Sequence, residues 1–246
     1  MEGYGRSSYG DAFADVYDEW YSASTDPEPI VELVTELAGL GGAVLELGVG
    51  TGRLAVPLAA RGLAVHGVDA SSAMLDRLRT RDPDRLVTVI EGDMVDDLPS
   101  GPFDVVLVAY NTFFNLESAE RQAACFAAVA ERLGSGGRFV IDAFVPEDPP
   151  RTGTVVAIRT MTAQHVVLSI SDHDPEQQHA AGHLVQLVDG QPVRLRPWVV
   201  RYAPPSELDE LAGKAGLRLE IRWEDADRRP FDSASPRHVS VYARRD

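Results

Sequence analysis

The sequence predicts an α/β protein: a doubly wound, mostly parallel, Rossmann-like sheet that carries a small inserted antiparallel β lobe. Two observations support this fold class. Between Ala43 and Phe144, short apolar runs alternate with amphipathic stretches, which is typical of parallel strands covered by helices on both faces. After Phe144 the segments instead alternate apolar and polar residues between turn signals, as antiparallel strands do.

The α/β core is expected in residues 41–145. Its strands are expected at Ala43–Leu47, Leu63–Val68, Leu86–Ile90, Asp104–Ala109 and Arg138–Phe144, and its helices at Arg53–Arg61, Ala73–Thr80 and Ser118–Leu133. In such a sheet the ligand binds at the carboxyl ends of the strands. Candidate site residues are therefore sought directly after each strand.

A helical cap is expected before the core, in residues 1–40. Tyr9, Phe13, Tyr17 and Tyr21 recur every fourth residue and are expected to share one face of a helix. An aromatic stripe of this kind by default faces a protein core. The alternative is that part of it lies against a bound ligand.

The inserted lobe is expected in residues 146–203, after a proline-rich break. Its strands are expected at His165–Ser171, His183–Val188 and Val193–Tyr202, with a hairpin turn at Asp189-Gly190. Pro197 predicts that its strand lies at a sheet edge. Residues 204–246 are expected to complete the core, with a helix from Pro204-Pro205 to Lys214 and strands at Leu217–Trp223 and His238–Ala243.

Composition narrows the function classes. The chain has 246 residues and a net charge of −15, which disfavours nucleic-acid binding. It lacks an apolar run long enough to span a membrane and an N-terminal signal sequence, so we expect a cytoplasmic protein with no membrane partner. The single cysteine, Cys125, is interpreted as a buried structural thiol, and no metal site is predicted. The oligomeric state stays open, with a homodimer as one option.

A glycine-rich turn directly after the first strand is the strongest functional signal. It reads Glu46-Leu47-Gly48-Val49-Gly50-Thr51-Gly52-Arg53. Glycines at this place let the backbone approach a ligand closely and present the N-terminus of the next helix to it. A dinucleotide fingerprint has the spacing G-x-G-x-x-G, whereas Arg53 occupies the position of the last glycine here. This spacing counts against a nicotinamide cofactor.

Two acidic residues follow the next two strands. Asp69 ends the second strand, where a carboxylate is able to accept hydrogen bonds from both ribose hydroxyls of a nucleoside; the alternative is a helix N-cap. Asp93, in Gly92-Asp93-Met94, follows the third strand. Its carboxylate suits an exocyclic adenine amine, and Met94 suits packing on the ring.

Together these motifs resemble those of the class I S-adenosylmethionine-dependent methyltransferases over residues 9–145. The segment from Tyr9 to Asp18 is similar to that of amino-sugar N-methyltransferases and related natural-product enzymes, which also carry an antiparallel lobe after the fifth strand. The resemblance implies S-adenosylmethionine as cofactor and methyl transfer to a nitrogen or oxygen of a small molecule. An NAD-dependent oxidoreductase and a non-catalytic S-adenosylmethionine-binding protein are the alternatives.

The resemblance also implies roles for individual residues. Glu46 and the loop from Gly48 to Gly52 would hold the methionine end of the cofactor. The full set of expected cofactor-binding residues is Tyr9, Tyr17, Glu46, Gly48, Gly50, Thr51, Gly52, Arg53, Asp69, Ala70, Gly92, Asp93, Met94, Ala109, Tyr110 and Asn111. Tyr21, Phe113, Phe114 and Arg196 are expected to contact substrate, although helix packing is an equal alternative for the two phenylalanines.

A catalytic base is optional for this chemistry. An amine acceptor needs only its neutral form, whereas a hydroxyl acceptor usually needs a base. His173 is the candidate, because the carboxylates of Asp172 and Asp174 flank it and raise its basicity. A solvated loop histidine is the alternative. Arg194, Arg196 and Arg201 alternate on one expected strand and suit a substrate anion, with solvated edge charges as the alternative.

Overall fold

The computed structural model describes residues 1–22 and 26–245 and contains a seven-stranded main sheet in the order β10-β11-β5-β4-β1-β2-β3. The strands are β1 Ala43–Leu47, β2 Ala64–Asp69, β3 Thr88–Glu91, β4 Phe103–Val108, β5 Leu133–Phe144, β10 Leu217–Trp223 and β11 Arg237–Arg244. The first five run parallel, and β11 is antiparallel to both β5 and β10. The strand order reverses between β1 and β4, which is where ligands of this architecture bind.

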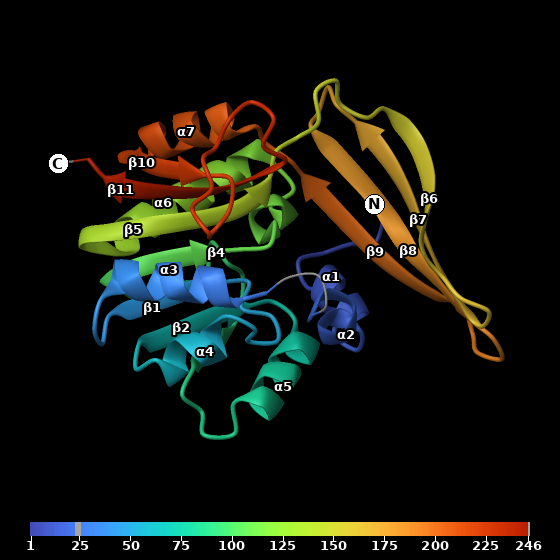
Figure 1. Ribbon diagram of the computed structural model, residues 1–246, viewed down its shortest axis with the longest axis horizontal. Helices are drawn as coiled ribbons and strands as arrows, with labels where there is room; N and C mark the ends of the chain where they lie inside the picture. The colour runs from blue at the N-terminus through green and yellow to red at the C-terminus, as the bar shows by residue number, and fades with distance from the viewer. Residues whose placement is uncertain (23–25, 246) are drawn as a thin grey trace.

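Helices cover both faces of this sheet (Figure 1). They are α3 Glu28–Ala38, α4 Ala55–Ala60 and α5 Ser72–Arg81 on one face, and α6 Ala119–Arg132 and α7 Pro205–Lys214 on the other, with a 3-10 helix, η1, at Thr112–Asn115. Neighbouring strand residues point to opposite faces: Val44 packs with α3 and α4, whereas Leu45 packs with α6. Burial on both faces explains the continuous apolar runs, and the doubly wound α/β fold predicted from the sequence is confirmed.

A separate four-stranded antiparallel sheet follows β5, in the order β6-β7-β8-β9. It consists of β6 Gly153–Met161, β7 His165–Asp174, β8 His179–Val188 and β9 Arg194–Arg201. β6 was not predicted from the sequence. Most residues of β6 are exposed, so the strand lacks the alternation of buried and exposed residues that the prediction relied on. Pro197 does lie on an edge strand, since β9 pairs with β8 only.

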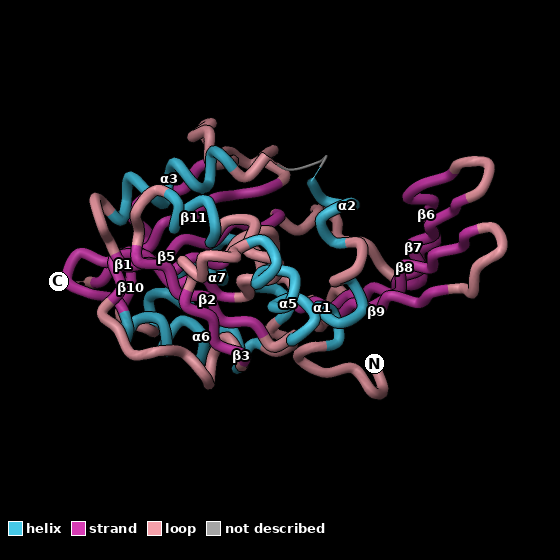
Figure 2. The backbone as a smooth tube through the Cα atoms, turned by 90° about the horizontal axis from the view of Figure 1, so that it is seen from below, coloured by secondary structure: helices cyan, strands magenta, loops and turns pink. Residues whose placement is uncertain are grey.

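The N-terminal segment corrects one expectation. It forms two short helices, α1 Ser8–Phe13 and α2 Tyr17–Ser22, instead of one helix. Both lie between the lobe and the core (Figure 2). Phe13 and Val16 pack there with Met74 of α5 and with Val167 and Leu184 of the lobe. No helix in residues 1–22 and 26–245 is long and apolar enough to cross a membrane.

Candidate active site

The glycine turn after β1 lies against the end of β2. The N–H groups of Gly48 and Val49 both donate to the carbonyl oxygen of Val68, at 2.8 and 3.0 Å. Gly48 has φ +69°, and a Cβ there would come within 2.3 Å of Thr112 Cγ2. A side chain is therefore excluded at Gly48 by both conformation and space.

Glu46 lies directly behind this turn and is fully buried. Burial raises the pKa of its carboxyl to about 8, although the backbone N–H of Ala55 and the charge of Arg53 act in the opposite direction. Oε2 of Glu46 has no hydrogen-bond partner among the described residues. A buried carboxylate oxygen without a donor fits a site that receives a cationic or N–H-bearing ligand group. The ammonium of a methionine moiety is such a group.

Asp69 is held rigidly at the end of β2. Its Oδ2 accepts a hydrogen bond from Gly50 N at 2.8 Å, and its Oδ1 accepts one from Ser71 N at 2.9 Å. Burial raises the pKa of the Asp69 carboxyl, and the hydrogen bonds from these two N–H groups oppose that rise. The N-cap of α5 is Ser71, whose hydroxyl accepts from Met74 N, so the alternative that Asp69 caps this helix is wrong. Each Asp69 oxygen has lone-pair capacity left for a ligand hydroxyl.

Asp93 and Met94 close the far end of the same site. Oδ1 of Asp93 accepts from Val95 N at 2.8 Å and pairs with Arg121 at 2.5 Å, which fixes the carboxylate after β3. A cavity of about 110 Å³ joins these residues to the glycine turn and to Asp69. Eight of the expected cofactor residues line it: Tyr9, Tyr17, Gly48, Gly50, Asp69, Ala70, Asp93 and Met94. We call this the adenosyl cavity.

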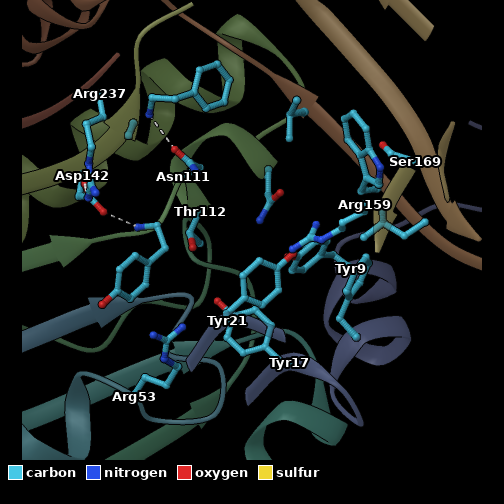
Figure 3. A pocket seen from close by; sticks show the side chains of 18 residues that line it. Tyr9, Tyr17, Tyr21, Arg53, Asn111, Thr112, Asp142, Arg159, Ser169 and Arg237 are labelled. Atoms are coloured by element: carbon cyan, nitrogen blue, oxygen red, sulfur yellow. Dashed lines mark hydrogen bonds and ion pairs between the residues drawn. The ribbon is translucent and has the colours of Figure 1, made fainter. Parts of the chain in front are cut away.

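A second cavity of about 480 Å³ adjoins the adenosyl cavity, and we call it the acceptor cavity (Figure 3). Tyr9, Tyr17, Thr112 and Asn115 line both. The other lining residues are Phe13, Tyr21, Arg53, Tyr110, Asn111, Asp142, Ala143, Phe144, Arg159, Ser169, Leu184, Trp198, Val200 and Arg237. Most of them come from the N-terminal helices, the ends of β4 and β5, and the lobe, whereas Arg53 lies between β1 and α4 and Arg237 begins β11. The cavity therefore lies where the N-terminal segment, the core and the lobe meet.

The turn after β4 forms the floor of the acceptor cavity. Tyr110 and Asn111 both have left-handed backbone conformations, at φ +54° and +68°. Hydrogen bonds hold this turn: Asp142 Oδ2 accepts from Tyr110 N at 3.0 Å, and Asn111 Oδ1 accepts from Phe144 N at 2.7 Å (Figure 3). Such conformations persist where the surroundings over-determine them, and they are enriched at functional sites.

Aromatic rings and arginines form the walls. Tyr9 stacks on Phe13 with ring centroids 4.4 Å apart, and Tyr17 lies 4.9 Å from Tyr21. The guanidinium of Arg159 lies 5.1 Å from the centroid of Tyr21, and Figure 3 shows it reaching in among the tyrosines. Burial raises the pKa of Tyr9 well above its ordinary value, so its hydroxyl stays protonated and able to donate.

Hydrogen bonds attach the N-terminal helices to the segments that follow β1 and β2. The hydroxyl of Ser71 donates to Asp11 at 2.6 Å, and the hydroxyl of Thr51 donates to Asp18 at 2.7 Å. Arg81 also pairs with Asp18, at 2.8 Å. Thr51, expected to bind cofactor, thus faces α2.

Other expected site residues lie elsewhere in the structure. Phe113 and Phe114 are fully buried in the core between η1 and α6, so the expectation that they contact substrate is wrong and the packing alternative holds. Ala109 is buried as well, and Gly52 packs against Leu78. Arg53, Tyr110 and Asn111 line the acceptor cavity. Asp142, Arg159, Trp198 and Arg237 also line the acceptor cavity, and none of them was predicted, because no local motif marks them.

Two further candidates do not line the acceptor cavity itself. His173 bonds to Ser171 Oγ at 2.9 Å and lines a neighbouring cavity of about 800 Å³. Arg196 is buried and pairs with Asp15, donating also to Gln186 and to the carbonyl oxygen of Ala12. Its charge connects the lobe to the N-terminal segment. Arg196 therefore binds protein groups where contact with a substrate anion was expected.

Comparisons with known proteins agree with this geometry. The model of a methyltransferase domain family matches residues 44–137, from β1 to the start of β5. The CcbJ methyltransferase from Streptomyces caelestis has a solved structure with 40% identity and a TM-score of 0.92, covering 99% of this chain and 100% of that one. An S-adenosylmethionine-dependent methyltransferase from Clostridium acetobutylicum shares the fold, with a TM-score of 0.82, 15% identity, and coverage of 95% and 98%.

A curated relative, the cypemycin N-terminal methyltransferase of a Streptomyces species, is 35% identical over 148 residues. The match spans 60% of each of the two chains. These relatives set aside the oxidoreductase alternative, in agreement with Arg53 at the position of the third glycine. Fold, glycine turn, carboxylates and relatives lead to one conclusion: the chain belongs to the class I S-adenosylmethionine-dependent methyltransferases.

Proposed function

We propose that this enzyme transfers a methyl group from S-adenosylmethionine to an amine nitrogen of a small organic molecule held in the acceptor cavity. The observation that carries the proposal is the composition of that cavity. Among the described residues lining it there is no histidine, and its one carboxylate, Asp142, already accepts from Tyr110 N and from Arg237. Because the described residues that line the cavity include no histidine, and the carboxylate among them already has donors, an acceptor that is nucleophilic in its neutral form fits best.

The charges of the cavity support an amine in a second way. Arg53, Arg159 and Arg237 line it, against Asp142 alone. Positive charge and aromatic walls both lower the pKa of a bound amine and so favour its neutral, nucleophilic form. The name of the curated relative from Streptomyces describes methylation of an N-terminus, which is also an amine.

Asp69, Asp93 with Met94, and Glu46 with the glycine turn are the residues we assign to the ribose, the adenine and the methionine end of the cofactor. The cofactor supplies a methyl group activated by positive sulfur. Tyr9 and Tyr17 line both cavities, so they are placed to orient the acceptor and to face that positive charge. With the cofactor bound, the acceptor nitrogen would form a bond to the methyl carbon as the carbon–sulfur bond breaks, and the surplus proton would leave to solvent. Positioning and exclusion of water are thus the main catalytic contributions of the chain.

The test is a methyl-transfer assay on small amines, each paired with the alcohol in which oxygen replaces nitrogen. We expect a mass gain of one methylene on amines, and a rate that rises with pH to a plateau as the bound amine loses its proton. Transfer to the alcohols alone would overturn the choice of nitrogen. Binding of S-adenosylhomocysteine without transfer to any acceptor would favour the non-catalytic binding protein.

A further inference from the structure

Three arginines line the acceptor cavity, and the structure accounts for the charge of two of them. Arg237 pairs with Asp142 at 2.9 Å. Arg53 lies close enough to Glu46 for its charge to oppose the raised pKa of that carboxyl, at the end of the site that we assign to the methionine moiety. The guanidinium of Arg159, by contrast, has neither an ion pair nor a hydrogen bond within residues 1–22 and 26–245.

The backbone of β6 directs Arg159 towards the cavity. The pairing of β6 with β7 shifts register at this point: Ile158 lies opposite Leu168 and Thr160 opposite Val167, so Arg159 is an extra residue in its strand. A β-bulge of this kind changes the direction of a side chain, and bulges are over-represented next to active sites. Figure 3 shows the result, because the Arg159 side chain extends from the lobe in among the tyrosines of the N-terminal helices.

Two aromatic rings hold the guanidinium of Arg159 in this position. It lies 5.1 Å from the ring centroid of Tyr21 and 5.8 Å from that of Trp20. Cation–π contacts use the face of a guanidinium, whereas its N–H donors lie in its plane and point outwards. Ser169 of β7 adds a hydroxyl donor to the same wall of the cavity, since it pairs with Ala157 of β6.

We propose that the acceptor is an amino acid whose carboxylate binds Arg159 while its nitrogen receives the methyl group. A guanidinium carries a single positive charge and a planar fork of donors that matches a carboxylate. A phosphate monoester would bring about two negative charges to this one cation, so it fits less well. The inference rests on the proposed function, because it names the class of acceptor for the same cavity.

The position of Arg159 places the bound carboxylate close to the reacting nitrogen. The hydroxyl of Tyr9 donates to that of Tyr21 at 3.5 Å, and Tyr9 lines both the adenosyl cavity and the acceptor cavity. Arg159 is near enough to the Tyr9 hydroxyl for its charge to oppose the raised pKa of that group. An anion held by Arg159 therefore lies beside the junction of the two cavities, where the methyl group arrives. This arrangement fits an α- or β-amino acid.

The net charge of the chain gives this local cation more weight. A chain of −15 repels an anionic acceptor at long range, so such an acceptor needs a local excess of positive charge at its site. The described lining of the acceptor cavity supplies this excess, with three arginines against one carboxylate. Arg196, which the sequence suggested for a substrate anion, is paired with Asp15, whereas Arg159 retains its charge for a ligand.

The first test measures binding of the carboxylate apart from methyl transfer. Phenylpropanoate and phenylpropanamide match phenylalanine and its amide without the amine, so both can be titrated into enzyme loaded with S-adenosylhomocysteine. We expect the acid to bind about tenfold more tightly than the amide to the wild type, and the two to bind equally to Arg159→Gln. Arg79→Gln on α5 removes the same charge from an exposed pair with Asp76 and should keep the tenfold preference.

The second test measures turnover of the corresponding amines. In Arg159→Gln we expect the KM for L-phenylalanine to rise about tenfold, while the KM for L-phenylalaninamide stays the same. Arg159→Lys should lie between the two enzymes, because it keeps the charge but loses the planar fork. Unchanged affinity for S-adenosylhomocysteine shows that each variant is folded.

Two results would overturn the proposal. One is a wild type that binds phenylpropanoate no better than phenylpropanamide. The other is an equal loss of acid and amide in Arg159→Gln, which would mean that Arg159 only closes the cavity by stacking on Tyr21 and Trp20. The proposed function fails on a different result, transfer to alcohols alone, and that result would leave the preference for phenylpropanoate intact.

Discussion

The cofactor side of the core and the lobe are built on different principles. In the core, β1 and β4 are covered on both faces, and Asp69 is fixed by two backbone N–H groups within the same βαβ unit. The lobe is joined to the N-terminal segment through its inner face and the Arg196–Asp15 pair, and to the helices of the core through Arg201, which donates to Gln122 and pairs with Glu207. Cofactor binding is therefore preorganised locally, whereas the acceptor cavity depends on how distant segments pack together.

Asp69→Ala should have the largest effect. Two hydrogen bonds from ribose hydroxyls to a carboxylate are worth together about 4 kcal/mol, so we expect about a thousandfold loss of affinity for S-adenosylhomocysteine in calorimetric titration. Asp76→Ala, on the exposed side of α5, is the control and should bind normally. Wild-type affinity in Asp69→Ala would contradict the assignment of Asp69 to the cofactor ribose.

Glu46→Gln tests the buried carboxyl through pH. The pKa of Glu46 is about 8 in the folded state and 4.5 when solvated, so the folded protein retains a proton that the unfolded chain loses. Its contribution to stability therefore falls as pH rises from 4.5 to 8, by about 3 kcal/mol after allowance for relaxation, and the glutamine variant should lack this fall.

Urea unfolding of the ligand-free protein across this pH range measures the difference, with Glu32→Gln on α3 as the control. Affinity for S-adenosylhomocysteine should change in the opposite sense, because the ionised carboxylate receives the ligand ammonium. It should rise towards pH 8 in the wild type and stay weak and flat in Glu46→Gln. Parallel pH profiles of the two proteins would contradict the assignment of Glu46.

The same contrast explains what sequence reasoning predicted. The strands of the core follow from continuous apolar runs, and the residues of the adenosyl cavity follow from signals adjacent to each strand: Gly48, Asp69 and Asp93 are marked by their neighbours in the chain. A local motif is sufficient there because a single βαβ unit supplies the geometry.

The acceptor cavity could not be predicted in this way. Arg159 lies on an exposed strand without a periodic pattern, and Asp142 and Trp198 reach the cavity only through tertiary packing. The aromatic stripe was recognised, but the break between Phe13 and Tyr17 was not, because the four-residue spacing is kept across it. Phe113 and Phe114 follow β4 as expected, yet η1 turns both rings into the core.

Asp15→Asn tests how the lobe is attached. The buried guanidinium of Arg196 loses its charged partner, so we expect the free energy of unfolding to fall by about 2 kcal/mol. Arg196 holds the pKa of Asp15 below its usual 3.8, so this stabilisation is complete at neutral pH and is lost as pH falls below that value. Arg194→Gln removes the exposed partner of Asp15 and should cost less than about 1 kcal/mol. An equal fall in the free energy of unfolding in the two variants would contradict the role of the Arg196–Asp15 pair in attaching the lobe.

Trp198→Ala should have the smallest effect of these variants, and it should weaken binding of the acceptor without weakening binding of the cofactor. Trp198 lines the acceptor cavity and its 800 Å³ neighbour but not the adenosyl cavity. Loss of its apolar surface should raise the KM for the methylated amine about tenfold, equivalent to about 1.4 kcal/mol, and leave affinity for S-adenosylhomocysteine within about twofold. Trp223→Ala, which removes the same side chain from the edge strand β10, is the control. It should change neither value at a temperature where both variants are folded. If Trp198→Ala weakens S-adenosylhomocysteine as much as it weakens the amine, the lobe also shapes the cofactor site, and the division between a local cofactor site and an assembled acceptor site does not hold.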